Sequence, residues 1–437
     1  MTASIQQAAQ CSNRPRDLLL WRLIPLLWLF CVACSPEEPS TVDQDDEMVD
    51  VSVSITPNTT DSVSTNSTSG STTIVQIAAG SQHSALLTAD GSVYSCGLGG
   101  NGQLGWPQNE YCYFPVPVEG LPPIVKVAAG SSMSLYLSED GELWGAGYGA
   151  DERLGPMPTT DVSTPVALGI SNVIDIAVDT NFTIIRKDDG SVSTFGVNDA
   201  GGLGHGSLQD SAIPVDLGFR AKAIAAGGSS AFALLEDGTI RSWGGNNYAN
   251  LGNPDVPSMG FSNSQTAAAS RTFSLVPVTV VLDSVVALAA GNNHTLAVRE
   301  DGSVWGWGHN AEFALGIQDG AQSHPTPVQI AGLSDIQAVA AGRGYSLALS
   351  QSGDVYSWGN SSQGKLGRTG SMERTRVPTR IAGLSAITKI VAGPDHAFAI
   401  DREGRGYGWG LNAYGELMSE LGEENQLKPV AVTFRSQ

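Results

Sequence analysis

Basic residues are scarce in this chain of 437 residues. Lysine and arginine number 23 against 43 aspartate and glutamate residues, so the formal net charge is −20 at pH 7. A chain this acidic repels phosphate backbones and anionic membrane surfaces, which disfavours non-specific nucleic-acid binding. Charged residues are only 15% of the sequence and glycine numbers 52. This composition favours short strands and tight turns over long helices.

Long apolar runs are lacking as well. One run stands out, Leu23 to Ala33, and it is too short to span a bilayer as a helix. Three arginines precede it, and this order predicts an export signal over residues 1–33. Residues 34–73 are acidic, rich in serine and threonine, and hold no aromatic residue. They cannot bury enough apolar surface to offset the entropy of ordering, so we expect a disordered tether.

The apolar run ends in Cys31-Val32-Ala33-Cys34. Small residues before such a cysteine resemble the lipobox of bacterial lipoproteins, although Cys31 stands where that motif usually has leucine. The resemblance implies that Cys34 becomes the first residue of the mature protein and carries a lipid. Ser35 behind it then favours the outer membrane or the cell surface. The alternative is simple cleavage after Ala33, which gives a secreted protein.

Cysteine is rare too, with five in the chain. Removal of the signal and acylation of Cys34 leave Cys96 and Cys112. In an oxidising compartment these two can form a disulfide, although their spacing alone does not decide it. Two buried free thiols are the equal alternative, because Cys96 occupies a position that holds tryptophan in other copies of the repeat described next.

What the chain does have is a repeat. Val286 to Gly316 contains an apolar run ending in Ala-Ala-Gly, a strand-like run, an Asp-Gly turn, a Trp-Gly pair and a closing Leu-Gly. This order of signals recurs in seven copies from residue 74 onward. Asp-Gly between alternating runs predicts hairpins, because the tight turn needs the positive φ that glycine supplies. Units of four short strands bury their faces only against neighbouring units, and seven can close into a ring.

These landmarks resemble the repeats of the regulator of chromosome condensation family. Asn101 to Gly105 and Gln363 to Gly367 carry the match most clearly. The resemblance implies an all-β fold, a seven-bladed β-propeller, which we assign to residues 74–437. Counting units from the Asp-Gly turn leaves one unit split between Ile74 to Thr88 and Gly404 to Phe434. We therefore expect one blade to be shared by the two ends of the repeat region, with no free edge.

Loop length varies mainly on one face of the predicted propeller. In a four-stranded meander, the turn after Ala-Ala-Gly and the loop between the third and fourth strands share a face. An insertion within residues 253–273 falls there, and variable aromatic loops on a rigid scaffold favour binding. The alternative is that the aromatic side chains only cover the blade beneath them. The residues that we assign to partner contact are Trp106, Tyr111, Tyr113, Phe114, Phe261, His309, Arg343 and Tyr345.

Recognised catalytic motifs are missing. The sequence has no His-Glu-x-x-His, Gly-x-Ser-x-Gly, P-loop or EF-hand spacing. His83, His294 and His396 share one repeat position, and equivalent positions on separate blades are not expected to converge on a metal ion. We expect histidines held by backbone groups at tight turns, with no metal, no cofactor and no enzymatic activity. The alternative is an enzyme whose polar residues converge in the central channel.

Together these features predict a monomeric binding scaffold outside the cytoplasm, attached to a membrane through Cys34, that recognises a protein partner. Known members of the resembling family include nuclear exchange factors for a small GTPase. Export and acidic charge argue against that activity, so neither a small GTPase nor nucleic acid is an expected partner. Other bacterial propellers of this type are secreted and bind proteins. Adhesion to a glycan or a surface polymer is a further alternative.

The lipid prediction can be tested directly. Mass spectrometry of the mature protein is expected to show a first residue of Cys34 with the added mass of a diacylglycerol group. A mature N-terminus at unmodified Cys34 would instead support the secreted alternative.

Overall fold

The computed structural model describes residues 73–107, 111–258, 272–369 and 374–434. The predicted export signal, the acyl site Cys34, nearly all of the tether and the predicted contact residue Phe261 lie outside the described residues. Within the described part of the chain, no helix is both long enough and apolar enough to cross a membrane.

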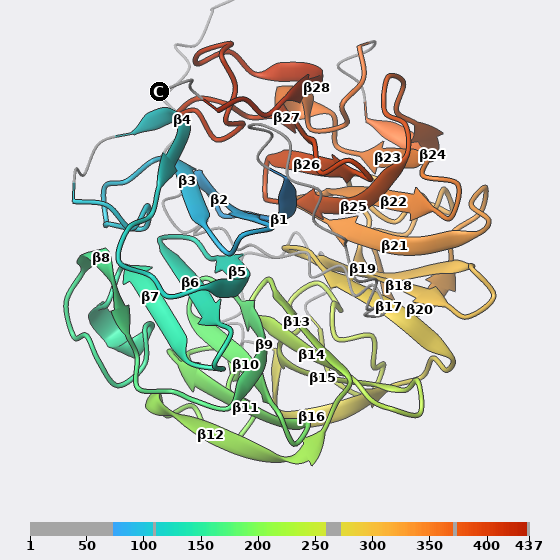
Figure 1. The fold of residues 1–437 in the computed structure, drawn as a ribbon. Helices are drawn as coiled ribbons and strands as arrows, with labels where there is room; N and C mark the ends of the chain where they lie inside the picture. Colours follow the sequence, from blue (N-terminus) through green and yellow to red (C-terminus); the bar gives the residue numbers. More distant parts are fainter. Residues whose placement is uncertain (1–72, 108–110, 259–271, 370–373, 435–437) are drawn as a thin grey trace, which may run out of the picture. The chain divides into compact units, whose positions relative to one another are not determined.

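The described residues form seven four-stranded antiparallel sheets, and each sheet is made of four consecutive strands. Figure 1 shows the sheets arranged as the blades of a ring, with the first strand of each blade innermost and the fourth outermost. The prediction of an all-β, seven-bladed β-propeller is confirmed.

We number the blades 1 to 7 in chain order. Two short 3-10 helices, η1 (Ala150–Glu152) and η2 (Ser362–Gly364), lie in loops of blades 2 and 6. The strands are β1 (Ile74–Ala79), β2 (His83–Thr88), β3 (Val93–Gly97) and β4 (Cys112–Pro117) in blade 1; β5 (Ile124–Ala129), β6 (Met133–Ser138), β7 (Leu143–Gly147) and β8 (Val162–Ala167) in blade 2; β9 (Val173–Val178), β10 (Phe182–Lys187), β11 (Ser191–Gly196) and β12 (Ser211–Arg220) in blade 3; β13 (Ala223–Gly227), β14 (Ser230–Leu234), β15 (Ile240–Gly245) and β16 (Phe273–Val280) in blade 4; β17 (Val285–Ala290), β18 (His294–Arg299), β19 (Val304–His309) and β20 (Ser323–Gln329) in blade 5; β21 (Ile336–Ala341), β22 (Tyr345–Ser350), β23 (Val355–Gly359) and β24 (Thr375–Arg380) in blade 6; and β25 (Ile387–Ala392), β26 (His396–Asp401), β27 (Gly406–Gly410) and β28 (Gln426–Ala431) in blade 7.

The prediction of a split blade is wrong. Strands β1 to β4 form one complete sheet and β25 to β28 form another, so the two ends of the repeat region do not share a blade. Blades 7 and 1 meet instead through one backbone bond and through side chains. The Ile74 N–H donates to the Gly404 carbonyl at 2.9 Å, His396 Nε2 lies 3.0 Å from Ser84 Oγ, and Lys389 Nζ donates to the Val75 carbonyl at 2.6 Å. A unit counted from the Asp-Gly turn begins at the third strand of one blade and ends at the second strand of the next.

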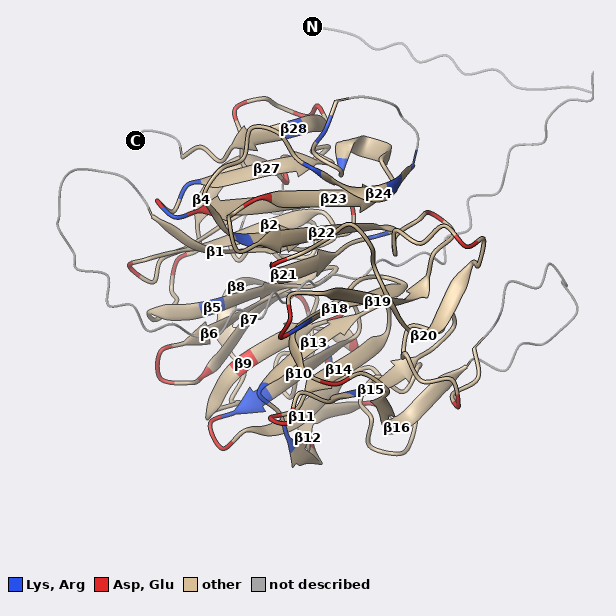
Figure 2. Ribbon diagram, turned by 90° about the vertical axis from the view of Figure 1, so that its right-hand side faces the viewer, with Lys and Arg blue, Asp and Glu red and all other residues tan. Residues whose placement is uncertain are grey.

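Strand direction divides the connections between two faces. The turn between the first and second strands and the loop between the third and fourth strands share one face, which we call the loop-rich face. The Asp-Gly turns and the links between blades lie on the other, the Asp-Gly face. The insertion after residue 253 follows β15, so it belongs to the loop-rich face as predicted. Charged residues lie mainly in turns and loops (Figure 2).

Tryptophan links each of blades 4 to 7 to the blade before it. Trp243, Trp307, Trp358 and Trp409 are fully buried, so they are packing residues. Each indole Nε1 donates to a carbonyl of the preceding blade, on the residue just before the Leu-Gly landmark of that blade. The pairs are Trp243 with Gly202 (2.9 Å), Trp307 with Asn250 (2.8 Å), Trp358 with Ala314 (2.7 Å) and Trp409 with Lys365 (3.0 Å).

Blade 2 fills the same space with a different residue. It has Ala146 at the tryptophan position, and Tyr136 on the neighbouring strand β6 is fully buried. A Cβ added to Gly105 would lie 2.9 Å from the Tyr136 hydroxyl, just as a Cβ on the equivalent Gly367 would lie 3.1 Å from the Trp409 ring. Blades with tryptophan have alanine at the position of Tyr136, so large and small residues exchange places within one packing volume.

Glycine sets how closely blades approach at the inner rim. A Cβ on Gly342 would lie 2.6 Å from the carbonyl oxygen of Gly393 in the next blade, and a Cβ on Gly291 would lie 2.7 Å from the carbonyl oxygen of Gly342. These contacts involve rigid backbone, so a larger residue would force the blades apart.

The exchange in blade 2 predicts strong coupling between two substitutions. Ala146→Trp alone should destabilise the protein by about 1–3 kcal/mol, because Tyr136 already fills the space. Tyr136→Ala alone should cost about 3–5 kcal/mol through a cavity. The double variant recreates the pairing of the other blades and should cost much less than the sum. Urea unfolding of all four proteins measures the coupling energy. Additive losses would contradict the shared packing volume.

Candidate binding site on the loop-rich face

A pocket opens on the loop-rich face where turns and loops of blades 6, 7, 1 and 2 come together. Its volume is about 430 Å³, and we call it the junction pocket. Turns between first and second strands and loops between third and fourth strands supply its walls. The lining residues are Ser81, Gln82, Ser131, Arg343, Gln363, Pro394, Asp395, Leu411, Ala413 and Tyr414.

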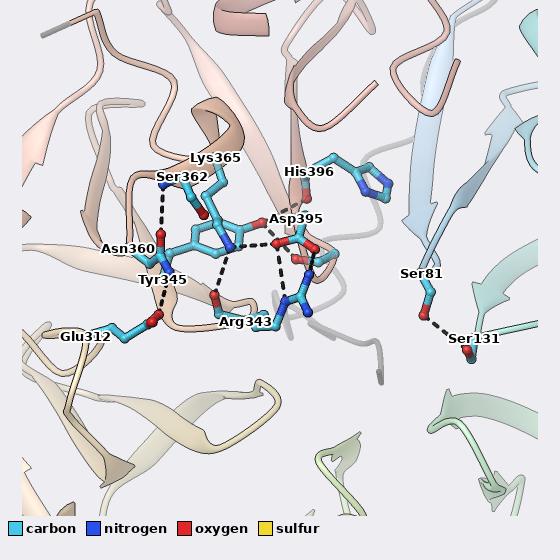
Figure 3. A network of polar contacts seen from close by, with 11 residues as sticks. Ser81, Ser131, Glu312, Arg343, Tyr345, Asn360, Ser362, Lys365, Asp395 and His396 are labelled. Atoms are coloured by element: carbon cyan, nitrogen blue, oxygen red, sulfur yellow. Dashed lines mark hydrogen bonds and ion pairs between the residues drawn. The ribbon is translucent and has the colours of Figure 1, made fainter. Parts of the chain in front are cut away.

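Three charged side chains meet at one side of the junction pocket (Figure 3). Asp395 follows β25, and Arg343 lies in the equivalent turn of blade 6. Arg343 Nε donates to Asp395 Oδ1 at 3.3 Å, and its Nη2 donates to Oδ2. Lys365 Nζ donates to Asp395 Oδ1 at 2.6 Å and to the Arg343 carbonyl at 3.3 Å. Both carboxylate oxygens of Asp395 therefore accept hydrogen bonds from cationic side chains.

Burial separates the roles of these three residues. The side chains of Lys365 and Asp395 are 2% and 5% exposed, whereas that of Arg343 is 35% exposed. Burial acts to raise the pKa of Asp395, but Lys365 and Arg343 outweigh it and hold that pKa below its usual value. Burial also lowers the pKa of Lys365, against the opposing effect of Asp395. Arg343 is thus the most exposed of the three charged side chains.

A tyrosine cluster, formed by Tyr111, Tyr113 and Tyr414, adjoins the junction pocket. The Tyr111 ring lies edge-on to Tyr113 with centroids 5.5 Å apart, and 6.5 Å from Tyr414, which also lines the pocket. Tyr113 donates its hydroxyl proton to Glu423 of blade 7. Tyr111 is 51% exposed. Two predicted contact residues are thus brought together, beside a third tyrosine that the sequence interpretation missed.

Other predicted contact residues lie apart from this surface. Trp106 and Phe114 are half-buried in blade 1 and do not line the junction pocket. His309 is half-buried in blade 5, with its ring 4.9 Å from that of Tyr248 of blade 4. Arg343 is the predicted residue that reaches the pocket directly. The predicted residues therefore do not form one surface.

Tyr345 is not a surface residue, so its assignment to partner contact is wrong. It begins β22 and is fully buried. Its hydroxyl oxygen lies 2.8 Å from the carbonyl oxygens of Gly393 and His396 in blade 7. The side chain links blades 6 and 7 from within, because the first residue of a second strand points between blades.

Cys96 and Cys112 are both free thiols in the structure. Cys96 Sγ donates to the Cys112 carbonyl at 2.5 Å, and burial raises the pKa of the Cys96 thiol. The structure therefore contains two free thiols and not a disulfide, and Cys96 occupies the position that holds a buried tryptophan in other blades.

The three repeat-position histidines pair across blades. His83, His294 and His396 are buried, and each Nε2 faces a serine hydroxyl of the next blade. The partners are Ser134 (3.0 Å), Ser346 (2.8 Å) and Ser84 (3.0 Å). This corrects the expectation of backbone partners at the turn. Burial lowers the pKa values to about 3, about 3 and about 4. In the described ranges, no group of three or more His, Cys, Asp or Glu residues could hold a metal ion.

Two buried carboxyl groups on the loop-rich face escaped the sequence interpretation. Burial raises the pKa of Asp179 to about 8 and that of Glu416 to about 7. Asp179 accepts from the Ser229 backbone N–H at 3.0 Å, and Glu416 from that of Tyr414 at 2.9 Å. They belong to blades 3 and 7, so they do not form a pair. Asp179 was signalled by the Ala-Val-Asp copy of the glycine landmark.

Fold and site together define a β-propeller of internal repeats whose variable loops build a polar pocket on one face. Two models described as the regulator of chromosome condensation (RCC1) repeat match the sequence, and the chain belongs to this family. The first matches residues 90–137, 189–234, 301–349 and 352–400, and the second matches residues 74–103, 221–249, 285–313, 336–365 and 387–416.

Similar proteins differ widely in size and name. The ultraviolet-B receptor UVR8 of Arabidopsis thaliana is 31% identical over 277 residues, which cover 61% of this chain and 60% of the receptor. The human E3 ubiquitin-protein ligase HERC2 is 30% identical over 272 residues, 59% of this chain but 5% of the ligase. The chain thus spans less than two thirds of the length of these relatives.

Solved structures share the fold. A crystal structure of Prp20p from Saccharomyces cerevisiae, described with its binding to Gsp1p and histones, has a TM-score of 0.64 at 25% identity, covering 74% of this chain and 80% of that one. Yeast RCC1 (Prp20) bound to Kap60 has a TM-score of 0.69 at 20% identity, covering 87% and 91%. The second likeness, at this identity, shows the fold alone.

The buried histidines predict a specific pH dependence of stability. His294 has a pKa of about 3 in the folded protein against 6.5 for the free side chain, so the unfolded chain binds one more proton between these values. Its contribution is present above pH 6.5 and is lost as pH falls toward 3. His294→Gln should reduce the slope of unfolding free energy against pH by about 1.4 kcal/mol per pH unit between about pH 4.5 and 6.

The matched control is Tyr345→Phe at the same repeat position. It removes a buried hydroxyl and leaves every imidazole in place, so it should lower stability without changing the slope. Urea unfolding across the pH range measures both. An unchanged slope for His294→Gln would show that the imidazole is not held neutral.

Proposed function

We propose that this protein is a non-catalytic binding scaffold outside the cytoplasm, anchored through a lipid on Cys34. It recognises a protein partner through the loop-rich face at the junction pocket and the adjoining tyrosine cluster. One observation carries this proposal: Tyr414 both lines the junction pocket and packs near Tyr111, so the pocket and the tyrosine cluster form one surface.

The chemistry of this surface suits protein recognition. Tyrosine offers a large contact area with a polar tip and few rotatable bonds, which makes it a frequent anchor of interfaces. The cluster lies beside a concave polar pocket on a scaffold of paired strands. Because this scaffold is already ordered, little conformational entropy is lost on binding. Loops held by such a scaffold are where binding residues concentrate.

The relatives support a protein partner in general terms. One similar structure is described with binding to Gsp1p and histones, and another is a complex with Kap60. The ligase HERC2 is matched over 5% of its length, which gives no reason to transfer its activity. We propose a partner other than a small GTPase or nucleic acid, because the chain carries a net charge of −20 and a sequence typical of export.

We propose that the protein is an outer-membrane or cell-surface lipoprotein and acts as a monomer. Residues 34–73 would hold the propeller clear of the membrane, since a flexible chain of this length spans about 30–40 Å on average. The loop-rich face would then be accessible to partners in the envelope or outside the cell.

Site-specific crosslinking tests the proposed face. A photoreactive amino acid in place of Tyr111 should crosslink one protein in intact cells, whereas the same amino acid in place of Val281 should not. Val281 is the matched control because it is 75% exposed and lies in a link on the Asp-Gly face. With the captured partner purified, Tyr111→Ala and Tyr414→Ala should each weaken binding about tenfold or more.

Two results would contradict the proposal. Equal crosslinking from positions 111 and 281 would show contact without a preferred face. Undiminished affinity of both alanine variants would place the interface elsewhere on the propeller.

A further inference from the structure

We propose that the tyrosine cluster binds an arginine side chain of the protein partner, with the guanidinium stacked on Tyr113 and its charge facing Glu423. The proposal deepens the function proposed above and rests on it, because it names the chemical group that the partner presents. It depends on three observations: the pairing of Tyr113 with a carboxylate, the same pairing in blade 2 with an arginine of the chain already in place, and the negative charge of the adjoining loop.

Blade 2 shows what a pair of tyrosine and carboxylate accepts. Tyr148, directly after β7, donates its hydroxyl proton to Asp151 Oδ2 at 3.2 Å. The guanidinium carbon of Arg153 lies 5.0 Å from the centroid of the same ring. The face of an aromatic ring carries partial negative charge and attracts the cation, and the nearby carboxylate has the opposite charge. The loop between β7 and β8 therefore contains a complete group of tyrosine, carboxylate and arginine.

The tyrosine cluster contains the first two members of this group. Tyr113 donates its hydroxyl proton to Glu423, and this hydrogen bond is the main cause that raises the pKa of Tyr113. A carboxylate that draws the phenolic proton toward itself makes the ring more electron-rich, which strengthens its attraction for a cation. Within the described ranges, no lysine or arginine of the chain lies over Tyr111, Tyr113 or Tyr414. The third member of the group can therefore come from a partner.

The two neighbouring rings form a corner that suits a flat cation. The planes of Tyr111 and Tyr113 meet at 70° with centroids 5.5 Å apart, and Tyr111 is 51% exposed. A guanidinium stacked on one ring can direct its N–H groups toward the second ring and toward Glu423 at the same time. An ammonium group has no flat face to stack, so the arrangement favours arginine over lysine.

A loop of blade 5 receives arginine from a different blade. Phe313 lies between β19 and β20 on the loop-rich face, and the guanidinium carbon of Arg376 in β24 of blade 6 lies 4.7 Å from its ring centroid. Arg374, directly before β24, faces Glu312 at 4.0 Å. A ring and a carboxylate on this face thus contact arginines that a separate blade supplies. A partner chain can supply an arginine to the tyrosine cluster in the same way.

The loop that carries Glu423 is acidic. Glu420, Glu423 and Glu424 are exposed and lie between β27 and β28. None of the three forms an ion pair with the described part of the chain. Residues 411–431 contain one basic residue, Lys428, so the three exposed glutamates outnumber it. This local excess of negative charge, in a chain with a net charge of −20, attracts a cationic group.

The junction pocket gives room for the residues beside the arginine. Tyr414 lines this pocket, whose volume is about 430 Å³, and lies 6.5 Å from Tyr111 between ring centroids. A small cation would contact the tyrosine cluster alone and leave the pocket unused. An arginine within a protein chain, with its neighbours in the pocket, therefore fits the whole surface better.

Titration of the full-length protein with small probes tests the inference. The probes are acetyl-Gly-Arg-Gly-amide, the same peptide with citrulline as a neutral isostere of arginine, and choline as a small quaternary ammonium ion. Ring signals of ¹³C-labelled tyrosine, assigned by tyrosine-to-phenylalanine variants, report binding at each ring. The arginine peptide should shift the Tyr111 and Tyr113 signals in a saturable way. The citrulline peptide should bind at least about tenfold more weakly, because it carries no positive charge.

Three variants locate the effect. Glu423→Gln should weaken binding of the arginine peptide about tenfold, because the guanidinium loses its charged partner while the ring remains. Tyr113→Leu replaces the ring by an aliphatic side chain and should abolish saturable binding. The matched control is Tyr148→Leu, which removes a tyrosine that Arg153 of the chain already covers. It should leave peptide binding unchanged, and an unchanged urea midpoint verifies that each variant is folded.

The proposal is supported by saturable binding of the arginine peptide that Glu423→Gln weakens, Tyr113→Leu abolishes and Tyr148→Leu leaves unchanged. Equal binding of the arginine and citrulline peptides overturns it. Binding of choline without binding of the arginine peptide also overturns it and would indicate a small quaternary ammonium ligand. If crosslinking from position 111 persists while no peptide binds, the arginine inference fails and the proposed scaffold function stands.

Discussion

Every blade of this propeller buries its faces only against its neighbours, so the contact between adjacent blades is the constraint on which the structure depends. The tryptophan Nε1 to carbonyl bond of blades 4 to 7 is its clearest form. The histidine–serine pairs and the glycines at the inner rim also hold adjacent blades in contact, at other positions along the blade interface. Such contacts are local between neighbours yet must close around a ring, which couples all seven.

The positions that join blades also supply the binding surface. The backbone carbonyl of Lys365 accepts a hydrogen bond from Trp409, and its side-chain amine donates one to Asp395. Arg343 and Asp395 occupy turn positions that hold neutral residues in the other blades. The repeat therefore fixes the backbone while leaving turn side chains free to differ. A site arises where two or three such differences fall side by side.

The all-β ring follows from the sequence because the Asp-Gly turns and Trp-Gly pairs determine local structure. The blade boundaries do not follow from the sequence, because a periodic pattern does not show where its unit begins. The same landmarks fit a unit that starts at the Asp-Gly turn and a unit that starts at β1. Tyr345 was misplaced because a residue beside a turn can point outward or between blades, and packing decides which. Tyr414 was missed because its partner Tyr111 lies some 300 positions away, on a contact created by ring closure.

The junction pocket lies where the first and last blades meet, and these blades share no strand. Closure there rests on side chains such as Ser84 and His396 and on the backbone bond from Ile74 to Gly404, not on a continuous ladder of backbone hydrogen bonds. A ligand that contacts both Gln82 of blade 1 and Tyr414 of blade 7 bridges the two blades. Ligand binding and ring closure are then thermodynamically linked. A ligand in the pocket stabilises the closed ring, and a change that weakens the contact between blades 7 and 1 lowers the affinity for the ligand.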